Sequence, residues 1–236
     1  MIGAVLLDLD DTLYAQAEWL SGAWDAVCAA ASHCTDVRAL RAALSAVAAE
    51  GSARGMIIDR ALARAGAVDV AVGPLVEAFR RYNAPSLTPY PGAVAALASL
   101  RAQVPVGLVT DGDPVIQRSK LRSLGFDAAF DVVVFSDELG RERRKPHPAP
   151  FRLALDQLQV TAAQAIYIGD HPEKDVLGPL AAGIRAIRVL TGEYGGVPSL
   201  ATPWATAPDV VSAIELAADR LRDGDAPNPR TPAHPV

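Results

Sequence analysis

Short apolar runs alternate with helical patterns along most of the chain. Runs rich in Val, Ile and Leu predict strands at 4–9, 104–110, 132–135, 165–168 and 186–190. Helical patterns lie between them, at about 92–102, 113–124, 148–158 and 175–182. Because the apolar runs show little polar alternation, they are typical of a parallel sheet covered on both faces. The pattern therefore predicts a doubly wound α/β domain.

One segment interrupts the alternation. Between residues 16 and 83 helix follows helix, rich in Ala, Leu and Arg, and the turn at 84–92 that ends the segment is punctuated by prolines. We expect an inserted all-helical domain at 15–87 and an α/β core formed by 1–14 and 88–222. The last fourteen residues, DGDAPNPRTPAHPV, are nearly devoid of large apolar groups, so we expect a disordered tail at 223–236.

Composition narrows the classes of partner. Half of the residues are apolar, 21% are charged, and the net charge is -5. This balance favours a globular protein and gives no overall attraction to nucleic acid. The first apolar run is broken at Asp8, so it predicts neither a signal peptide nor a membrane span. We expect a cytoplasmic protein, monomeric or homodimeric, with a small-molecule ligand and with no nucleic acid or membrane partner.

Polar residues follow several predicted strands, and ligands of parallel sheets bind at that edge. The first group is Asp8-Leu9-Asp10-Asp11-Thr12-Leu13. The two-residue spacing of Asp8 and Asp10 places both side chains on the same side of an extended chain, where two carboxylates share a cation or a proton. A solvated acidic turn is the alternative. An EF-hand loop fits worse, because Leu13 occupies its glycine position.

The second and third groups are Thr110-Asp111-Gly112 and the basic loop around Lys145. A hydroxyl and backbone N–H groups at a strand end can hold phosphate oxygens. A plain turn, with a helix cap at Asp111 or Asp113, is the alternative. Lys145 lies in a run of charges that could be solvated, but the prolines that follow it stiffen the loop and fix where its ammonium points.

The fourth group follows Gly169 and supplies Asp170 and Asp175. Carboxylate oxygens at a strand end suit Mg²⁺, and a helix cap formed by either residue is the alternative. Together the ordered groups resemble the haloacid dehalogenase superfamily, whose four motifs are matched by Asp8-x-Asp10-x-Thr12, Thr110, Lys145 and Gly169-Asp170-x-x-x-x-Asp175. The resemblance covers residues 1 to about 190. It implies a Rossmann-like sheet in strand order 5-4-1-2-3 and likens the inserted helices to a C1-type cap.

The resemblance also implies the chemistry of a phosphatase acting on a small phosphate ester. Asp8 would attack phosphorus to give an aspartyl phosphate, and Asp10 would act as general acid and base. Phosphoryl oxygens would be bound at Thr110, Asp111, Gly112 and Lys145.

Mg²⁺ would be held by Asp8, by the backbone carbonyl of Asp10 and by Asp170. Asp175 would order ligand waters or Lys145. The family commonly has Asn where this chain has Asp111, and a carboxylate is unfavourable beside phosphate. The side chain of Asp111 is therefore expected to point away.

Substrate selection would fall to the inserted helices. Six residues there could touch the leaving group, and packing or solvated surface is the alternative for each: Trp19, Trp24, Arg54, Met56, Arg60 and Arg64. Arg54 is the preferred candidate. Nucleotides, sugar phosphates and small phospho-acids are equally compatible with the sequence.

Three other functions use the same residues differently. A 2-haloacid dehalogenase would direct Asp8 at carbon and would need neither an acid at position 10 nor a metal. A phosphomutase shares the core and must keep water from the aspartyl phosphate. A non-catalytic module that binds phosphorylated ligands would be expected to have lost Asp8, Asp10 or Lys145, and all three are present.

Overall fold

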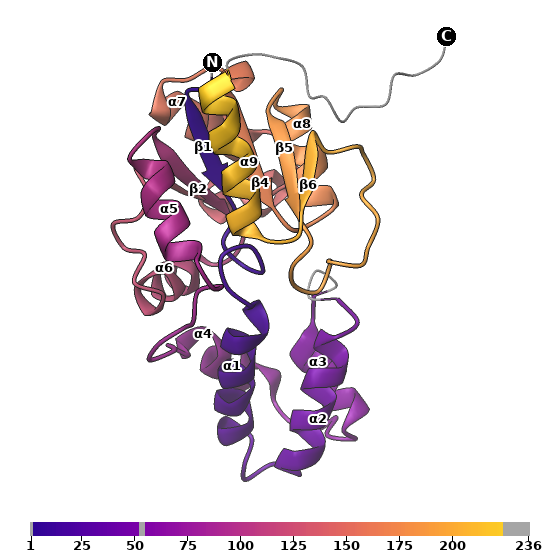
Figure 1. The fold of residues 1–236 in the computed structure, drawn as a ribbon. Coiled ribbons are helices and arrows are strands. Elements are labelled where there is room, and N and C mark those ends of the chain that lie inside the picture. The colour runs from indigo at the N-terminus through magenta and orange to yellow at the C-terminus, as the bar shows by residue number, and fades with distance from the viewer. Residues whose placement is uncertain (1, 52–54, 224–236) are drawn as a thin grey trace.

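The computed structural model describes residues 2–51 and 55–223. Its centre is a parallel sheet of six strands in the order β3-β2-β1-β4-β5-β6 (Figure 1). The strands are β1 (Ala4–Leu7), β2 (Val106–Thr110), β3 (Val132–Phe135), β4 (Ala165–Gly169), β5 (Arg185–Val189) and β6 (Ala205–Ala207). The predicted fold class and the order of the first five strands are confirmed.

Helices cover both faces of this sheet and form a separate group at one end of it (Figure 1). The α-helices are α1 (Gln16–Ala30), α2 (Val37–Ala48), α3 (Ile57–Arg64), α4 (Val72–Arg81), α5 (Ala93–Arg101), α6 (Pro114–Ser123), α7 (Ala149–Leu158), α8 (Gly178–Ala181) and α9 (Val210–Asp223). Short 3₁₀ turns are η2 (Ser136–Leu139), η3 (Arg141–Arg143) and η4 (Ala162–Gln164), and η5 (Glu173–Leu177) is a π-helical turn.

Alternate residues of the central strand face opposite helix layers. Val5 and Leu7 join the cluster that contains residues of α5, α6 and α9, whereas Leu6 joins Phe151 of α7 on the other face. All four side chains are fully buried. Burying one such side chain contributes about 1.5 to 3 kcal/mol, so both layers hold the strand ends in fixed positions.

The sequence prediction missed two elements at the C-terminal side of the fold. Strand β6 extends the sheet beyond β5, with Ala205 opposite Ile187, and α9 packs against α5. The strand reads Ala-Thr-Ala and lacks the bulky β-branched runs that mark the others, so its pairing with β5 is what defines it. Helix α9 extends to residue 223, and the remainder of the predicted tail lies outside the described residues.

Helices α1 to α4, here called the helical insertion (residues 16–81), have an apolar cluster of their own. It contains Trp24, Leu40, Leu44, Leu62 and Leu75, and the described residues of the insertion include no strand. Figure 1 shows the helical insertion beyond the end of the sheet to which β1 leads. Among the described residues, none of the helices is long and apolar enough to cross a membrane.

Candidate active site

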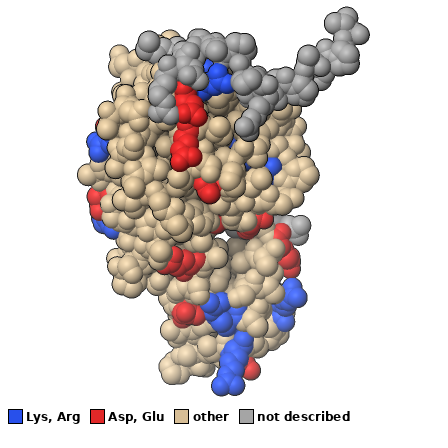
Figure 2. All heavy atoms as spheres, viewed as in Figure 1, with Lys and Arg blue, Asp and Glu red and all other residues tan. Residues whose placement is uncertain are grey.

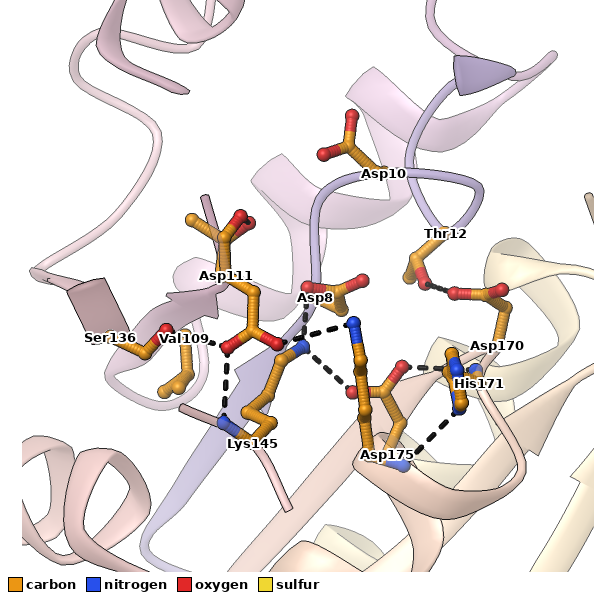
Figure 3. Close-up of polar contacts among 12 residues, drawn as sticks. Asp8, Asp10, Thr12, Val109, Asp111, Ser136, Lys145, Asp170, His171 and Asp175 are labelled. Atoms are coloured by element: carbon orange, nitrogen blue, oxygen red, sulfur yellow. Dashed lines mark hydrogen bonds and ion pairs between the residues drawn. The ribbon is translucent and has the colours of Figure 1, made fainter. Parts of the chain in front are cut away.

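A buried lysine joins two carboxylates where β1 and β4 end. The Nζ atom of Lys145 lies 2.7 Å from Oδ1 of Asp8 and 2.7 Å from Oδ1 of Asp175, and it donates to the Tyr167 hydroxyl at 3.0 Å. All these side chains are buried. Asp8 follows β1, while Asp175 lies in η5 after β4, and Figure 3 shows the three charged groups converging. The fold thus brings together residues 137 and 30 positions apart.

The backbone at the end of β4 is shaped for this contact. A Cβ atom at Gly169 would lie 2.5 Å from Cγ of Asp175, a distance that real Cβ atoms do not reach. The other Asp175 oxygen accepts the backbone N–H of His171 at 3.0 Å. Glycine at position 169 therefore lets the Asp175 carboxylate pack against the strand end.

Asp170 completes a group of three buried carboxylates. Ligand oxygens of Asp8, Asp170 and Asp175 lie within 4.8 Å of one another, and Asp170 accepts the Thr12 hydroxyl at 3.3 Å. Burial raises the pKa of Asp8 to about 7, Lys145 opposes that rise and Asp175 adds to it. Burial, with Asp175 and Asp8, holds the pKa of Asp170 well above its usual range. These hard oxygen ligands carry excess negative charge and fit a divalent cation such as Mg²⁺.

Asp10 lies apart from that group. Its two carboxylate oxygens lie 2.8 and 2.9 Å from Nζ of Lys120 and accept hydrogen bonds from Gln117 and from the Tyr14 hydroxyl. Figure 3 shows this carboxylate pointing away from Lys145. The inference that the Asp8 and Asp10 side chains point the same way is not met, because Figure 3 shows the two carboxylates pointing in different directions, although both line the cavity described below. Strand β1 ends at Leu7, before either residue. The carbonyl of Asp10, not this carboxylate, is the expected metal ligand.

The bend after Asp10 has a local cause. Asp11 adopts the left-handed conformation, with φ of 54°, which Asp tolerates better than most residues. Its carboxylate accepts the backbone N–H groups of Gln16 at 2.9 Å and Glu193 at 3.3 Å. These bonds fix the loop between β1 and α1 against the loop that follows β5.

The end of β2 places Thr110 and Asp111 at the same edge. The Thr110 hydroxyl accepts the Gln117 amide at 2.7 Å and donates to the backbone carbonyl of Asp111 at 3.4 Å, a long bond that a better acceptor could replace. Asp111 accepts the Ser136 hydroxyl at 2.5 Å and the backbone N–H of Lys145 at 3.1 Å. Burial would raise the pKa of Asp111, but Lys145 and Lys174 outweigh it and lower that pKa.

The carboxylate of Asp111 is therefore charged and engaged by neighbouring groups, with Lys174 Nζ at 3.4 Å. Gly112 differs from its neighbours, because its N–H donates to Asp137 at 3.0 Å and the residue does not line the cavity described below. Asp113, not Asp111, caps α6, where its side chain accepts the N–H of Val115. The cap alternative thus applies to Asp113.

A cavity of about 100 Å³ opens at these strand ends. It is lined by the predicted residues Asp8, Asp10, Thr110, Asp111, Lys145, Asp170 and Asp175, together with Asp11, Gln16, His171, Lys174, Glu193 and Tyr194. Figure 2 shows a hollow where the helical insertion meets the core. Sequence reasoning missed the second set because its members lie in loops, at the start of α1 and in the short turn η5, where side-chain directions have no periodic signal.

The candidates in the helical insertion fall into different environments. Trp19 and Trp24 are buried in apolar clusters, and Arg60 and Arg64 pair with Glu50, which favours packing and surface roles for these four. Met56 is 70% exposed. Arg54 lies outside the described residues.

The family model for haloacid dehalogenase-like hydrolases matches residues 2–183. The chain belongs to this haloacid dehalogenase-like family. It is 34% identical to the glyceraldehyde 3-phosphate phosphatase of Methanopyrus kandleri over 82% of this chain and 86% of that one. It is 32% identical to the phosphoglycolate phosphatase of Yersinia pestis over 91% of this chain and 94% of that protein. The predicted enzyme class, a phosphoric monoester hydrolase of the haloacid dehalogenase-like family, is confirmed.

Solved structures of haloacid dehalogenase-like proteins share the fold. A 2-haloacid dehalogenase from Pseudomonas syringae pv. tomato is 28% identical, covers 93% of this chain and 99% of its own, and superposes with a TM-score of 0.64. A magnesium-bound hydrolase from Bacillus subtilis covers 93% of this chain and 98% of its own with a TM-score of 0.72, and at 18% identity it shows the fold alone.

Proposed function

We propose that this chain is a Mg²⁺-dependent phosphatase that hydrolyses a small phosphate ester through an aspartyl phosphate on Asp8. The observation that carries the proposal is the buried group of Asp8, Asp170 and Asp175 around Lys145. A nucleophilic carboxylate, a fixed cation and carboxylates suited to a metal meet at one cavity. These are the components that phosphoryl transfer requires.

In the proposed reaction Asp8 attacks phosphorus and the alkoxide leaves. Lys145 orients the Asp8 carboxylate and offsets negative charge as the dianionic phosphate enters. The Thr110 hydroxyl, whose oxygen is already engaged by Gln117, donates its proton to a phosphoryl oxygen. Water then attacks the aspartyl phosphate and restores Asp8.

Asp8 and Asp170 would hold Mg²⁺ together with the backbone carbonyl of Asp10, while Asp175 would order Lys145. When bound, the ion supplies positive charge that neutralises the carboxylates and the phosphoryl oxygens. Burial and neighbouring carboxylates raise the pKa values of Asp8 and Asp170, and a bound cation would favour the charged form of both groups.

Asp10 is assigned the proton transfers. It protonates the leaving oxygen in the first step and takes a proton from water in the second. Asp10 lines the cavity, so it faces the space that the substrate would occupy. The helical insertion would act as a cap that excludes water, and this favours small metabolites over phosphoproteins.

Phosphate release from purified protein tests the proposal. The panel contains nucleotides, sugar phosphates and small phospho-acids, each with Mg²⁺ or with EDTA, and Asp8→Asn is the matched variant. We expect release that needs Mg²⁺ and vanishes in Asp8→Asn. Release that persists in the variant at the wild-type rate would contradict the proposal.

A second assay tests the alternative function, that of a 2-haloacid dehalogenase. The similarity to a 2-haloacid dehalogenase makes 2-chloropropionate the appropriate probe, with halide release as the signal. Because dehalogenation would use Asp8 but would need neither an acid at position 10 nor a metal, the presence of Asp10 and Asp170 leads us to expect no halide release. Halide release without phosphate release would assign the chain to dehalogenation.

A further inference from the structure

Helix α6 presents two buried polar side chains to the site. Gln117 and Lys120 are 2% and 3% exposed, and their spacing of three residues places them on one face of the helix. The same face buries Ile116 and Leu121 in the apolar core. Burying a lysine ammonium costs free energy unless the charge is paired, so the group that pairs with Lys120 indicates the role of Lys120.

That partner is Asp10. The Lys120 ammonium contacts both carboxylate oxygens, at 2.8 and 2.9 Å, and Gln117 donates to one of them at 2.9 Å. The same Gln117 amide group donates to the Thr110 hydroxyl at 2.7 Å. Helix α6 therefore links the Asp10 carboxylate to the end of β2.

Helix α1 shields the pair from the other side. Lys120 Nζ lies 4.6 Å from the centre of the Trp19 ring, and Trp19 is 2% exposed. The ring packs edge-on against Phe79 and Tyr82 of the α4 region, at 5.2 and 5.6 Å. The ammonium thus has an anion on one side and an aromatic face on the other, which leaves it little room to move.

The place in which Asp10 is held matches the geometry of the proposed reaction. In phosphoryl transfer the attacking and leaving oxygens lie roughly in line, so the leaving oxygen is on the side of phosphorus away from Asp8. Asp10 lines the cavity, and Figure 3 shows its carboxylate directed away from Lys145 and Asp175. A general acid for the leaving oxygen belongs on that far side.

We propose that Lys120, aided by Gln117, is a positioning residue that holds the Asp10 carboxylate at the leaving-group side of the cavity. The proposal rests on the proposed phosphatase function. Lys120 does not touch substrate, and it acts through Asp10. Losing Lys120 frees the carboxylate to turn away, so proton transfer to the leaving oxygen slows while phosphate binding, which uses other residues, is retained.

The test is a double-mutant cycle of wild type, Asp10→Asn, Lys120→Met and the double variant. Each is assayed with an alkyl phosphate, whose leaving oxygen needs an acid, and with an activated aryl phosphate, which needs it less. We expect Lys120→Met to lower kcat for the alkyl ester by roughly tenfold or more, since positioned acids contribute on the order of a hundredfold or more. We expect a smaller loss for the aryl ester and a KM within about threefold of wild type.

In the Asp10→Asn background, the same change should lower kcat by less than about threefold, because the group on which Lys120 acts is already disabled. Equal losses in both backgrounds, or equal losses for both esters, would overturn the positioning role. Should Lys120→Met fail to fold, as urea unfolding would reveal, Lys120→Gln is read by the same criteria. Wild-type release and its loss in Asp8→Asn are measured first, so their absence refutes the phosphatase function itself, and the positioning role with it.

Discussion

The site contains two buried lysines, and each binds one carboxylate of the Asp8 and Asp10 pair. Lys145 is 4% exposed and lies among Asp8, Asp175 and the nearby Asp170. Lys120 is 3% exposed and forms an ion pair with Asp10. We call the group around Lys145 the first cluster and the pair of Lys120 and Asp10 the second cluster. The two clusters differ in how their charges are balanced.

The difference lies in charge compensation. One ammonium, that of Lys145, pairs with Asp8 and Asp175 while Asp170 lies close by, and burial, with a further contribution from Asp175, raises the pKa of Asp8 to about 7. Burial would also raise the pKa of Asp10, but Lys120, with hydrogen bonds from Tyr14 and Gln117, outweighs it and lowers that pKa. The first cluster is therefore suited to take up a cation, while the second holds the Asp10 side chain in place in its charged form, the form that takes a proton from water in the second step.

Replacing each lysine by Met gives the largest expected effect. Removing one partner of a buried ion pair costs about 3 to 5 kcal/mol of unfolding free energy, so both variants should lose stability in urea. Activity should separate them, because Lys145→Met also removes charge from the phosphate site and should lower kcat by roughly a thousandfold. Lys120→Met should show a smaller loss of kcat than Lys145→Met. Equal losses of activity would remove the distinction between the clusters.

Mg²⁺ should stabilise the protein through the first cluster alone. At a hundred times its dissociation constant a ligand adds about 2.7 kcal/mol to the free energy of unfolding. Asp170→Asn should abolish this gain, because it removes a ligand oxygen from the group of three carboxylates. Asp10→Asn keeps its backbone carbonyl and should retain the gain. Urea unfolding with Mg²⁺ or EDTA measures both, and the reverse pattern would assign the ion to the second cluster.

Asp111→Asn should tighten inhibition by inorganic phosphate about threefold, or roughly 0.7 kcal/mol. The amide oxygen can still accept from Ser136 and from the backbone of Lys145, while a negative charge beside the phosphate site disappears. Lys174→Met is the matched control and should weaken inhibition, since it removes the cation 3.4 Å from Asp111. Weaker inhibition in Asp111→Asn would show that the charge itself is needed.

The smallest expected effect concerns the surface ion pair between Arg101 and Asp131, which lies away from both clusters. Hydrogen bonds from Arg101 and from the Val106 N–H lower the pKa of Asp131, whose side chain is 35% exposed. Asp131→Asn should cost about 0.5 kcal/mol of unfolding free energy at pH 7.

The direction of its pH dependence follows from that lowered pKa. The stabilisation is present above the unfolded-state pKa of about 4 and is lost as the pH falls through the folded-state value. Urea unfolding of both proteins between pH 7 and pH 3 should therefore show the difference shrinking. A difference that grew in acid would contradict this sign.

The two lysines also differ in how well the sequence predicts their roles. Lys145 could be singled out because it lies in a proline-stiffened loop within an ordered set of motifs, and apolar runs predicted the five strands around it. Lys120 has no such context. Its signal is positional, since Gln117 and Lys120 share a helix face with Ile116 and Leu121, where apolar residues are the rule.

The direction of the Asp10 side chain could not be inferred from spacing. It depends on where β1 ends and on the left-handed turn at Asp11, whose carboxylate accepts the N–H groups of the nearby Gln16 and of the distant Glu193. The short strand β6 was missed for a similar reason, because its pairing with β5 defines it rather than its composition.

Trapping the covalent intermediate tests the central claim most directly. Asp10→Asn, which should slow hydrolysis of the aspartyl phosphate, is mixed with Mg²⁺ and a ³²P-labelled aryl phosphate, quenched in acid and digested. We predict hydroxylamine-sensitive label on the peptide that contains Asp8, and no label when Asp8→Asn is added. Turnover with label on another residue, or turnover that survives Asp8→Asn, would contradict it.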